Sequence, residues 1–191
     1  MADLEASALA LLRSRDPGAL RSIADAHGRR LYRAARGMGH SPADAEDLVQ
    51  EVFVTFLESL DRFEGRAQVG TWLYGILHHK SLERRRAVSR EALSDPIDVM
   101  FESQFDGNGL WLQPPAPDRR VQAQQTGAAI AGCLEALPDH QREVFHLRQV
   151  EELSASEVSK ITGQSITHIG VLLHRARARL RACLEEKGWG R

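Results

Sequence analysis

The sequence lacks any long hydrophobic run. None of its apolar segments approaches the roughly 18 residues that a membrane-spanning helix needs. The first sixteen residues, MADLEASALALLRSRD, open with an acid and carry no basic stretch ahead of a hydrophobic run, so they do not resemble a secretion signal. We therefore expect a cytoplasmic protein. At 191 residues the chain suits one or two small domains.

Residues that hold metals or perform catalysis are also scarce. The two cysteines, Cys133 and Cys183, are 50 positions apart and have no C-x-x-C spacing, which predicts neither a metal site nor a disulfide but two small buried side chains on helices. His78 and His79 diverge by about 100° on a helix and have no evident third ligand. No glycine-rich phosphate loop or nucleophile motif is present. We expect no metal, no cofactor and no enzymatic activity.

The net charge of −1 hides blocks of opposite sign. Residues 44–64 contain seven acids and one base, whereas the segment HHKSLERRR at 78–86 is basic. Residues 87–126 contain six acids and three arginines, and residues 165–181 contain four arginines and no acid. Because charge distribution says more about partners than the sum does, we expect two kinds of partner.

Helical periodicity occurs in two stretches, which predicts an all-α protein with two small domains. Breaks at 15–18, 37–42 and 64–70 divide the first stretch into about four helices, and breaks at 137–139, 151–154 and 162–165 divide the second into four. The segment between them is rich in proline and has no sustained period, which is typical of a linker. We expect domains at 1–88 and 126–191 joined by a linker at 89–125 that carries Phe101, Phe105 and Trp111.

The second stretch ends in a predicted helix-turn-helix. Ser154 and Glu157 form a capping-box pattern, and Gly163 supplies a left-handed turn residue before a longer helix. In such a motif the second helix enters the DNA major groove, although an ordinary helical hairpin with a solvated basic face remains the alternative. An apolar stripe faces the core, made of Ile166, Ile169, Leu173, Ala176, Leu180 and Cys183. The candidate DNA contacts are Gln164, Ser165, Thr167, His168, His174, Arg175, Arg177 and Arg179.

Two helices of the first stretch carry different chemistry. The helix that begins after Ser41, with Pro42 at its first position, has an apolar side and a narrow acidic side made by Asp44, Asp47, Glu51 and Glu58, with Gln50 beside it. The next helix, expected from about Thr71, sets aromatic residues beside basic ones, which suits unstacked DNA bases and phosphates. Trp72 and Tyr74 cannot share a helix face, so one of the two is expected in the core.

The segments DAEDLVQEVFVTFLESLDRFEG, TWLYGILHHKSLERRR and LPDHQREVFHLRQVEELSASEVSKITGQSITHIGVLLHRARARLR resemble regions 2 and 4 of the extracytoplasmic-function (ECF) sigma factors of the sigma-70 family. The resemblance implies an alternative sigma factor that binds core RNA polymerase through its beta-prime coiled coil and beta flap and directs initiation at specific promoters. It implies polymerase contacts at Asp44, Asp47, Gln50 and Glu51, and minus-thirty-five recognition by the helix-turn-helix. For minus-ten recognition and melting it implies Arg66, Thr71, Trp72, His78, His79, Lys80, Arg84 and Arg85.

The segments WLYGILHHK and VLLHRARARLRACLEEKGW are most similar to a subgroup that is held off by a zinc-binding anti-sigma factor. The chain departs from the family at Gly75, where an arginine is frequent, at His79, where an asparagine is frequent, and at 170–172, where GVL replaces a lysine-serine-arginine run. These departures leave the promoter preference open. A helix-turn-helix regulator that does not replace the housekeeping sigma factor is the alternative function.

Overall fold

The computed structural model describes residues 10–63, 65, 68–88 and 123–189. Throughout these ranges the regular structure is helical and contains no strand, so the all-α prediction is confirmed. The helices fall into two compact units, which are described separately. Among the described helices, none combines the length and the apolar character that crossing a membrane requires. The linker aromatics Phe101, Phe105 and Trp111 lie outside the described ranges.

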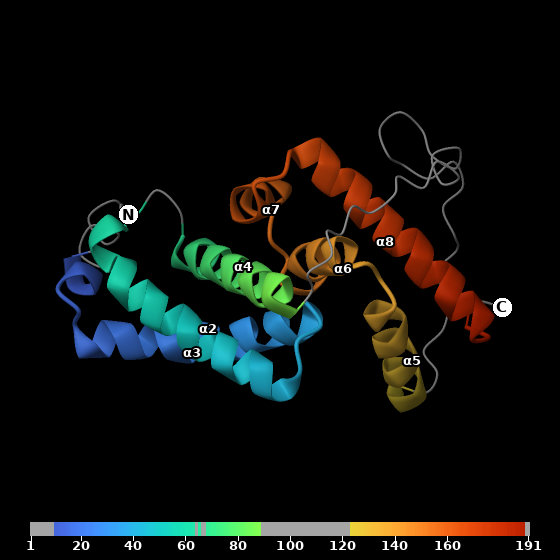
Figure 1. Ribbon diagram of the computed structural model, residues 1–191, viewed down its shortest axis with the longest axis horizontal. Helices are drawn as coiled ribbons and strands as arrows, with labels where there is room; N and C mark the ends of the chain where they lie inside the picture. Colours follow the sequence, from blue (N-terminus) through green and yellow to red (C-terminus); the bar gives the residue numbers. More distant parts are fainter. Residues whose placement is uncertain (1–9, 64, 66–67, 89–122, 190–191) are drawn as a thin grey trace. The chain divides into compact units, whose positions relative to one another are not determined.

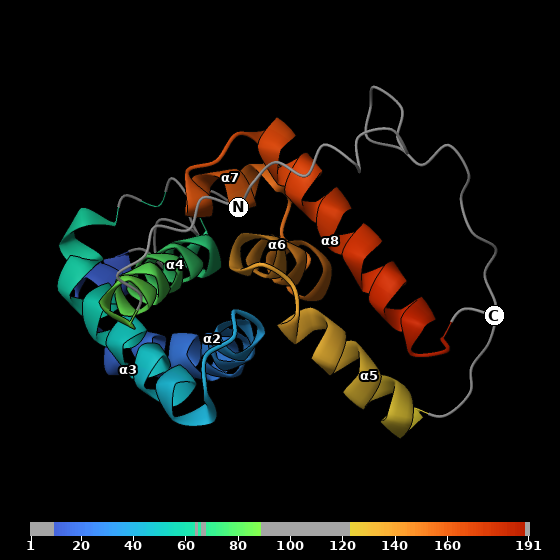
Figure 2. The same cartoon turned by 45° about the vertical axis from the view of Figure 1, so that its right-hand side comes forward.

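The first unit contains α2 (Pro17–Gly37), α3 (Pro42–Ser59), the short 3₁₀ helix η1 (Leu60–Arg62) and α4 (Val69–Val88). Figures 1 and 2 both show α2, α3 and α4 side by side. The apolar side predicted for α3 faces this core, where Leu48, Val52 and Phe56 are at most 1% exposed. Removing this much apolar surface from water is the main force that holds such a three-helix unit together.

Capping residues set where these helices begin. The Asp16 carboxylate accepts a hydrogen bond from the Ala19 backbone N–H ahead of α2, and the Ser41 hydroxyl accepts one from the Asp44 backbone N–H ahead of α3. Each cap is followed by a proline at the first helical position, where a missing N–H costs nothing. The predicted helix breaks at 15–18 and 37–42 are confirmed.

The second unit contains α5 (Ala123–Glu135), α6 (Asp139–Phe145), a π-helical turn η3 (His146–Val150) and α8 (Ile166–Glu186). Helices α5 and α6 pack along α8, the long red helix of Figures 1 and 2. Helix α7 (Ala155–Thr162) precedes α8 in the chain. The breaks predicted at 137–139, 151–154 and 162–165 are confirmed.

Two predictions about this unit are wrong. Cys133 on α5 and Cys183 on α8 form a disulfide, with their Cα atoms 5.8 Å apart. The sequence spacing carries no sign of it, because the packing of α5 against the far end of α8 is a tertiary contact. Ile166 is not part of the buried stripe of α8: it is 56% exposed, because it lies in the first turn of the helix, whereas Leu172 and Ala178 are buried instead.

Candidate functional site

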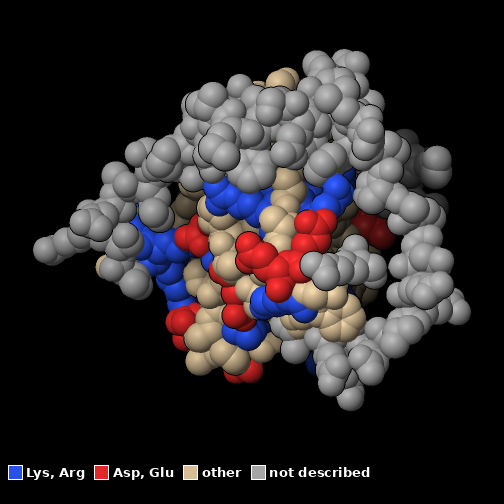
Figure 3. Space-filling view, turned by 90° about the vertical axis from the view of Figure 1, so that its right-hand side faces the viewer, with Lys and Arg blue, Asp and Glu red and all other residues tan. Residues whose placement is uncertain are grey.

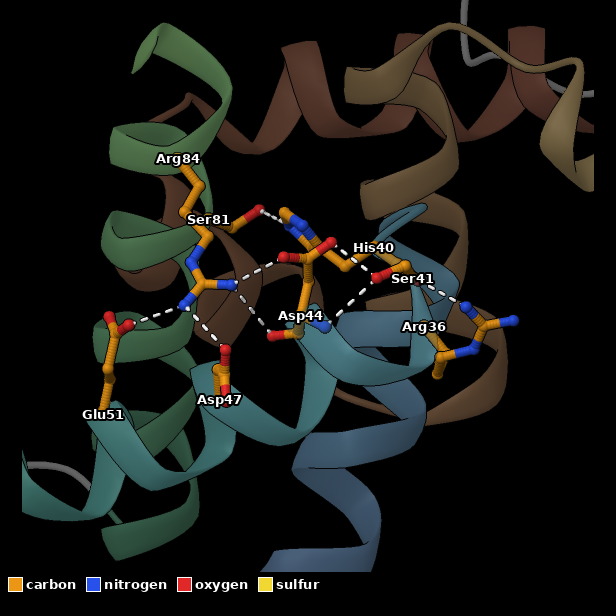
Figure 4. Close-up of polar contacts among 8 residues, drawn as sticks. All are labelled: Arg36, His40, Ser41, Asp44, Asp47, Glu51, Ser81 and Arg84. Atoms are coloured by element: carbon orange, nitrogen blue, oxygen red, sulfur yellow. Dashed lines mark hydrogen bonds and ion pairs between the residues drawn. The ribbon is translucent and has the colours of Figure 1, made fainter. Parts of the chain in front are cut away.

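The acidic side of α3 is bridged to α4 by a single guanidinium. Arg84 on α4 donates hydrogen bonds to the carboxylates of Glu51 at 2.7 Å and Asp44 at 3.0 Å, and it lies 3.8 Å from the carboxylate of Asp47 (Figure 4). The hydrogen bond to Glu51, followed by the attraction of the three carboxylates, raises the pKa of Arg84. The bridge fixes three acids, spaced at i, i+3 and i+7 along α3, against the neighbouring helix.

A second set of polar contacts surrounds the first turn of α3. The Ser41 hydroxyl donates to the Asp44 carboxylate at 2.6 Å and accepts from the Asp44 backbone N–H, which orients that carboxylate. The hydrogen bond from Ser41, and to a lesser degree the nearby charge of Arg84, lowers the pKa of Asp44. His40 Nε2 lies 2.7 Å from the Ser81 hydroxyl of α4, so the segment ahead of α3 is also tied to α4 (Figure 4). The acidic side is therefore held in a fixed orientation.

An open groove lies beside this acidic side, between α3 and Lys80 of α4. One apolar side chain, Val54, is 54% exposed within it. Val54 and Thr55 are not among the site residues predicted from the sequence, although their spacing of three to four residues from Gln50 and Glu51 places them on the same side of the helix. The groove is lined by Asp47, Gln50, Glu51, Val54, Thr55, Glu58 and Lys80.

The residues of α4 that the family resemblance assigned to DNA have different surroundings. Thr71 and His78 are 7% and 6% exposed, so their side chains lie inside the fold. Arg84 binds the acids of α3, and Arg85 donates to the backbone carbonyl of Met38 at 3.1 Å. His79 is exposed. The predicted set is therefore only partly accessible to a ligand: His79 is exposed, whereas Thr71 and His78 are buried and two of the arginines bind other groups of the protein.

The aromatic prediction for α4 is confirmed in one respect. Tyr74 is the core residue of the pair, at 2% exposure, whereas Trp72 is half-buried and packs edge-on against Phe63 with ring centroids 5.3 Å apart. Lys80 is partly exposed and lies 3.6 Å from the Glu83 carboxylate, one turn along the helix. Arg66 lies outside the described residues.

The predicted turn between α7 and α8 has the expected local chemistry. The Ser154 hydroxyl accepts from the Glu157 backbone N–H, and the Glu157 carboxylate accepts from the Ser154 backbone N–H, so the capping box is confirmed. Gly163 has a φ of +71°, in the left-handed region that favours glycine. The Ser165 hydroxyl caps α8 by accepting from the His168 backbone N–H at 3.2 Å. Ser165 therefore has a structural role at the start of α8.

The polar side of α8 presents exposed and half-buried groups together. Thr167 and His168 are exposed in its first turn, and Gln164, just before it, is half-buried. Further along, Arg175 and Arg179 are half-buried, while Arg177 donates to the Gln149 side chain of η3 at 2.8 Å. Burial, followed by the charges of Arg177 and Arg175, lowers the pKa of His174. His174 is therefore a poorer cation than the sequence suggests.

Charge is not segregated everywhere on the surface. On the face that Figure 3 draws, Lys and Arg side chains lie among Asp and Glu side chains and do not form a surface of one sign. A mixed surface of this kind gives little long-range attraction for a polyanion.

Comparison with known proteins identifies the family. Residues 23–91 match the model of sigma-70 region 2, and residues 127–180 match that of sigma-70 region 4. The chain is 32% identical, over 86% of each sequence, to the ECF RNA polymerase sigma factor ShbA of Streptomyces griseus subsp. griseus. It is 30% identical, over 83% of each sequence, to the RNA polymerase sigma factor CnrH of Cupriavidus metallidurans.

A solved structure agrees with these matches. A chain in the structure of CnrH in complex with the cytosolic domain of CnrY superposes with a TM-score of 0.67 at 26% identity, covering 94% of this chain and 96% of that one. The fold and the two matched regions thus define a bacterial transcription initiation factor. The chain belongs to the sigma-70 family, as an RNA polymerase sigma factor of the ECF group.

Proposed function

We propose that this chain directs core RNA polymerase to its own set of promoters, and that the groove on α3 is the surface that binds the polymerase. The observation that carries the proposal is the fixed acidic side of α3 with an accessible groove beside it. Asp47, Gln50, Glu51 and the first-turn Asp44 offer oxygen acceptors, and Val54 offers an apolar contact. A basic helical partner, such as the beta-prime coiled coil, fits that combination.

The promoter contacts divide between the two units. On α4, the half-buried Trp72 offers a ring on which an unstacked base can stack, and His79 and Lys80 lie further along the helix. On α8, Thr167, His168 and Gln164 are placed at the start of the helix, where a recognition helix reaches base edges. Arg175 and Arg179 follow as phosphate contacts. The first set is assigned to the minus-ten element and the second to the minus-thirty-five element.

The low net charge fits a factor that works only as part of a larger assembly. When a chain with a net charge of −1 binds DNA by itself, counterion release contributes little to the free energy of binding. Once polymerase holds both units near the promoter, the second DNA contact becomes effectively intramolecular, and two weak contacts suffice. The beta flap is the expected polymerase contact of the C-terminal unit.

Regulation by a partner protein is part of the proposal. A chain of the CnrH–CnrY complex structure is similar to this chain, and the residues at 72–80 and 171–189 resemble the subgroup that pairs with a zinc-binding anti-sigma factor. We assign the chain to the cytoplasm, where polymerase works, and to a stress or envelope response that release of such an inhibitor would start.

Reconstituted transcription tests this function against the alternative of an ordinary helix-turn-helix regulator. Core polymerase free of sigma factor is supplied with fragmented genomic DNA from the same bacterium, with and without the chain, and the 5′ ends of the RNA are sequenced. The proposal predicts new, discrete start sites that appear with the chain alone. A regulator would give no discrete starts until the housekeeping sigma factor is added, and that outcome would overturn the proposal.

A further inference from the structure

The disulfide of the second unit joins two helices that are distant in the sequence. Cys133 on α5 and Cys183 on α8 have Cα atoms 5.8 Å apart and a separation of 50 residues. The chain contains no other cysteine, so within one molecule each thiol has a single possible partner. The bond closes a loop that includes α6, η3, α7 and most of α8. Its formation or loss therefore affects the whole second unit.

The two cysteine residues differ in their exposure to solvent. Cys133 is 1% exposed, within a cluster that includes Leu137, Ala176 and Leu180, whereas Cys183 is half-buried near the end of α8. An incoming thiolate therefore reaches the Cys183 sulfur, and the Cys133 sulfur becomes the leaving group.

We propose that Cys133 and Cys183 form a redox modification site, whose reaction partners are a dithiol reductant and a peroxide oxidant. The inference rests on the proposed function in one respect, because a sigma factor works beside polymerase in a reducing compartment. Disulfides in such compartments are usually transient and sense the redox state. The pair is then a dithiol in resting cells and a disulfide under oxidising conditions.

Reduction is a two-electron exchange. One thiolate of the dithiol attacks the Cys183 sulfur, the disulfide bond breaks, and Cys133 leaves as a thiolate that takes up a proton. The second thiol of the reductant, as its thiolate, attacks the mixed disulfide and releases Cys183 as a thiolate, so the reductant ends as a cyclic disulfide.

Oxidation restores the bond. The Cys183 thiolate attacks peroxide to form a sulfenic acid, and one oxygen leaves as water after protonation. Cys133 then attacks the sulfenic sulfur and releases a second water. Two thiols and one peroxide thus yield one disulfide and two waters.

The oxidation state controls how firmly α5 is held. In the disulfide form α5 is covalently fixed to the end of α8, whereas in the dithiol form the small cluster around Leu137 and Leu180 holds it alone. Breaking a cross-link raises the conformational entropy of the state in which α5 has separated from α8 more than that of the state in which the two helices are packed together. Reduction therefore loosens α5 while the first unit is unaffected.

Thiol trapping on the full-length native chain tests the site. The protein is equilibrated in buffers of reduced and oxidised dithiothreitol at pH 7, quenched with acid, alkylated with a maleimide and weighed by mass spectrometry. The proposal predicts a single transition from no adduct to two adducts, because both thiols appear together. Two adducts in every buffer would mean that the pair does not form. No adduct even in fully reduced buffer would mean that the disulfide is inert, and either result would overturn the proposal.

Single variants test the order of attack. With an excess of oxidised glutathione, C133S should form a mixed disulfide at Cys183 at least tenfold faster than C183S does at Cys133. Equal rates would contradict the assigned leaving group. Circular dichroism of both variants verifies that the helices are retained.

Hydrogen exchange tests the consequence. Amides of α5 should exchange faster after reduction of the wild-type chain, amides of α3 should not change, and the double variant C133A/C183A should exchange alike in both buffers. Identical α5 exchange in oxidised and reduced wild type would contradict the proposed loosening. Polymerase binding measured on the same samples separates the two proposals. If the two thiols appear on reduction but the chain does not bind polymerase, the sigma-factor function is overturned. If the chain binds polymerase but the thiols do not appear, the redox site is overturned.

Discussion

At the scale of single residues, the position of Arg84 has the largest consequence for the site. Its sequence neighbours, Arg85 and Arg86, make it look like one more cation of a DNA-facing helix. The structure instead directs its guanidinium at Asp44 and Glu51 on α3. One side chain thereby neutralises part of the acidic side and fixes its orientation.

R84M should destabilise the chain by about 1 kcal/mol, because the variant removes a small ion-pair network that is partly open to solvent. The measurement is urea unfolding followed by circular dichroism. The loss should shrink in 1 M salt, where exposed charges are screened over about 3 Å. R86M, at an exposed position two residues away, is the matched control. Equal losses in the two variants would contradict a specific bridge at Arg84.

His174 and Arg175 should differ in their contribution to DNA affinity. The lowered pKa of His174 means that its protonation, and any phosphate attraction, is reached only below its ordinary value of about 6.5. When the chain binds duplex DNA as part of its complex with core polymerase at pH 7, R175Q should reduce the slope of log Kd against log salt by about 0.9, the value for one lost phosphate contact. H174Q should leave that slope unchanged. A comparable reduction in H174Q, measured by fluorescence anisotropy, would show that His174 is charged at neutral pH.

At the scale of elements, local signals predicted the helices well. The caps at Ser41 and Ser154, the prolines that start α2 and α3 and the glycine at 163 each act within four residues, so the sequence alone shows them. The disulfide and the Arg84 bridge depend on which helices pack together. No local pattern encodes such packing, so neither feature is predictable from the sequence alone.

Two glycines near the start of α8 should respond oppositely to alanine. G163A places a side chain at a φ of +71° and should destabilise the turn ahead of α8 by about 1 kcal/mol. G170A lies within α8 with no atom within 4 Å of the new Cβ, and it should stabilise the unit by about 0.8 kcal/mol, because alanine favours helix. Thermal unfolding measures both changes. A fall in melting temperature for G170A would show that the unit needs a bare backbone there.

At the scale of the whole molecule, we propose a division between two kinds of surface. In this proposal the acidic residues of α3 and the groove beside them bind polymerase, and selected residues of α4 and α8 bind DNA. The sequence suggests this division through its charge blocks and through the family resemblance, and the division stays a prediction. It did not predict that Thr71 and His78 are buried, because their neighbours in space come from other helices.

The proposed binding of core polymerase at the groove on α3 is tested by the variant Q50K. Gln50 lines the groove and takes no part in the Arg84 bridge, so the variant adds one positive charge without breaking a described ion pair. A24K adds the same charge at an exposed position of α2 and is the control. With both variants equally helical, Q50K should bind sigma-free polymerase about tenfold more weakly than wild type, a cost of about 1.4 kcal/mol, and A24K should bind normally. Wild-type affinity in Q50K would contradict the claim.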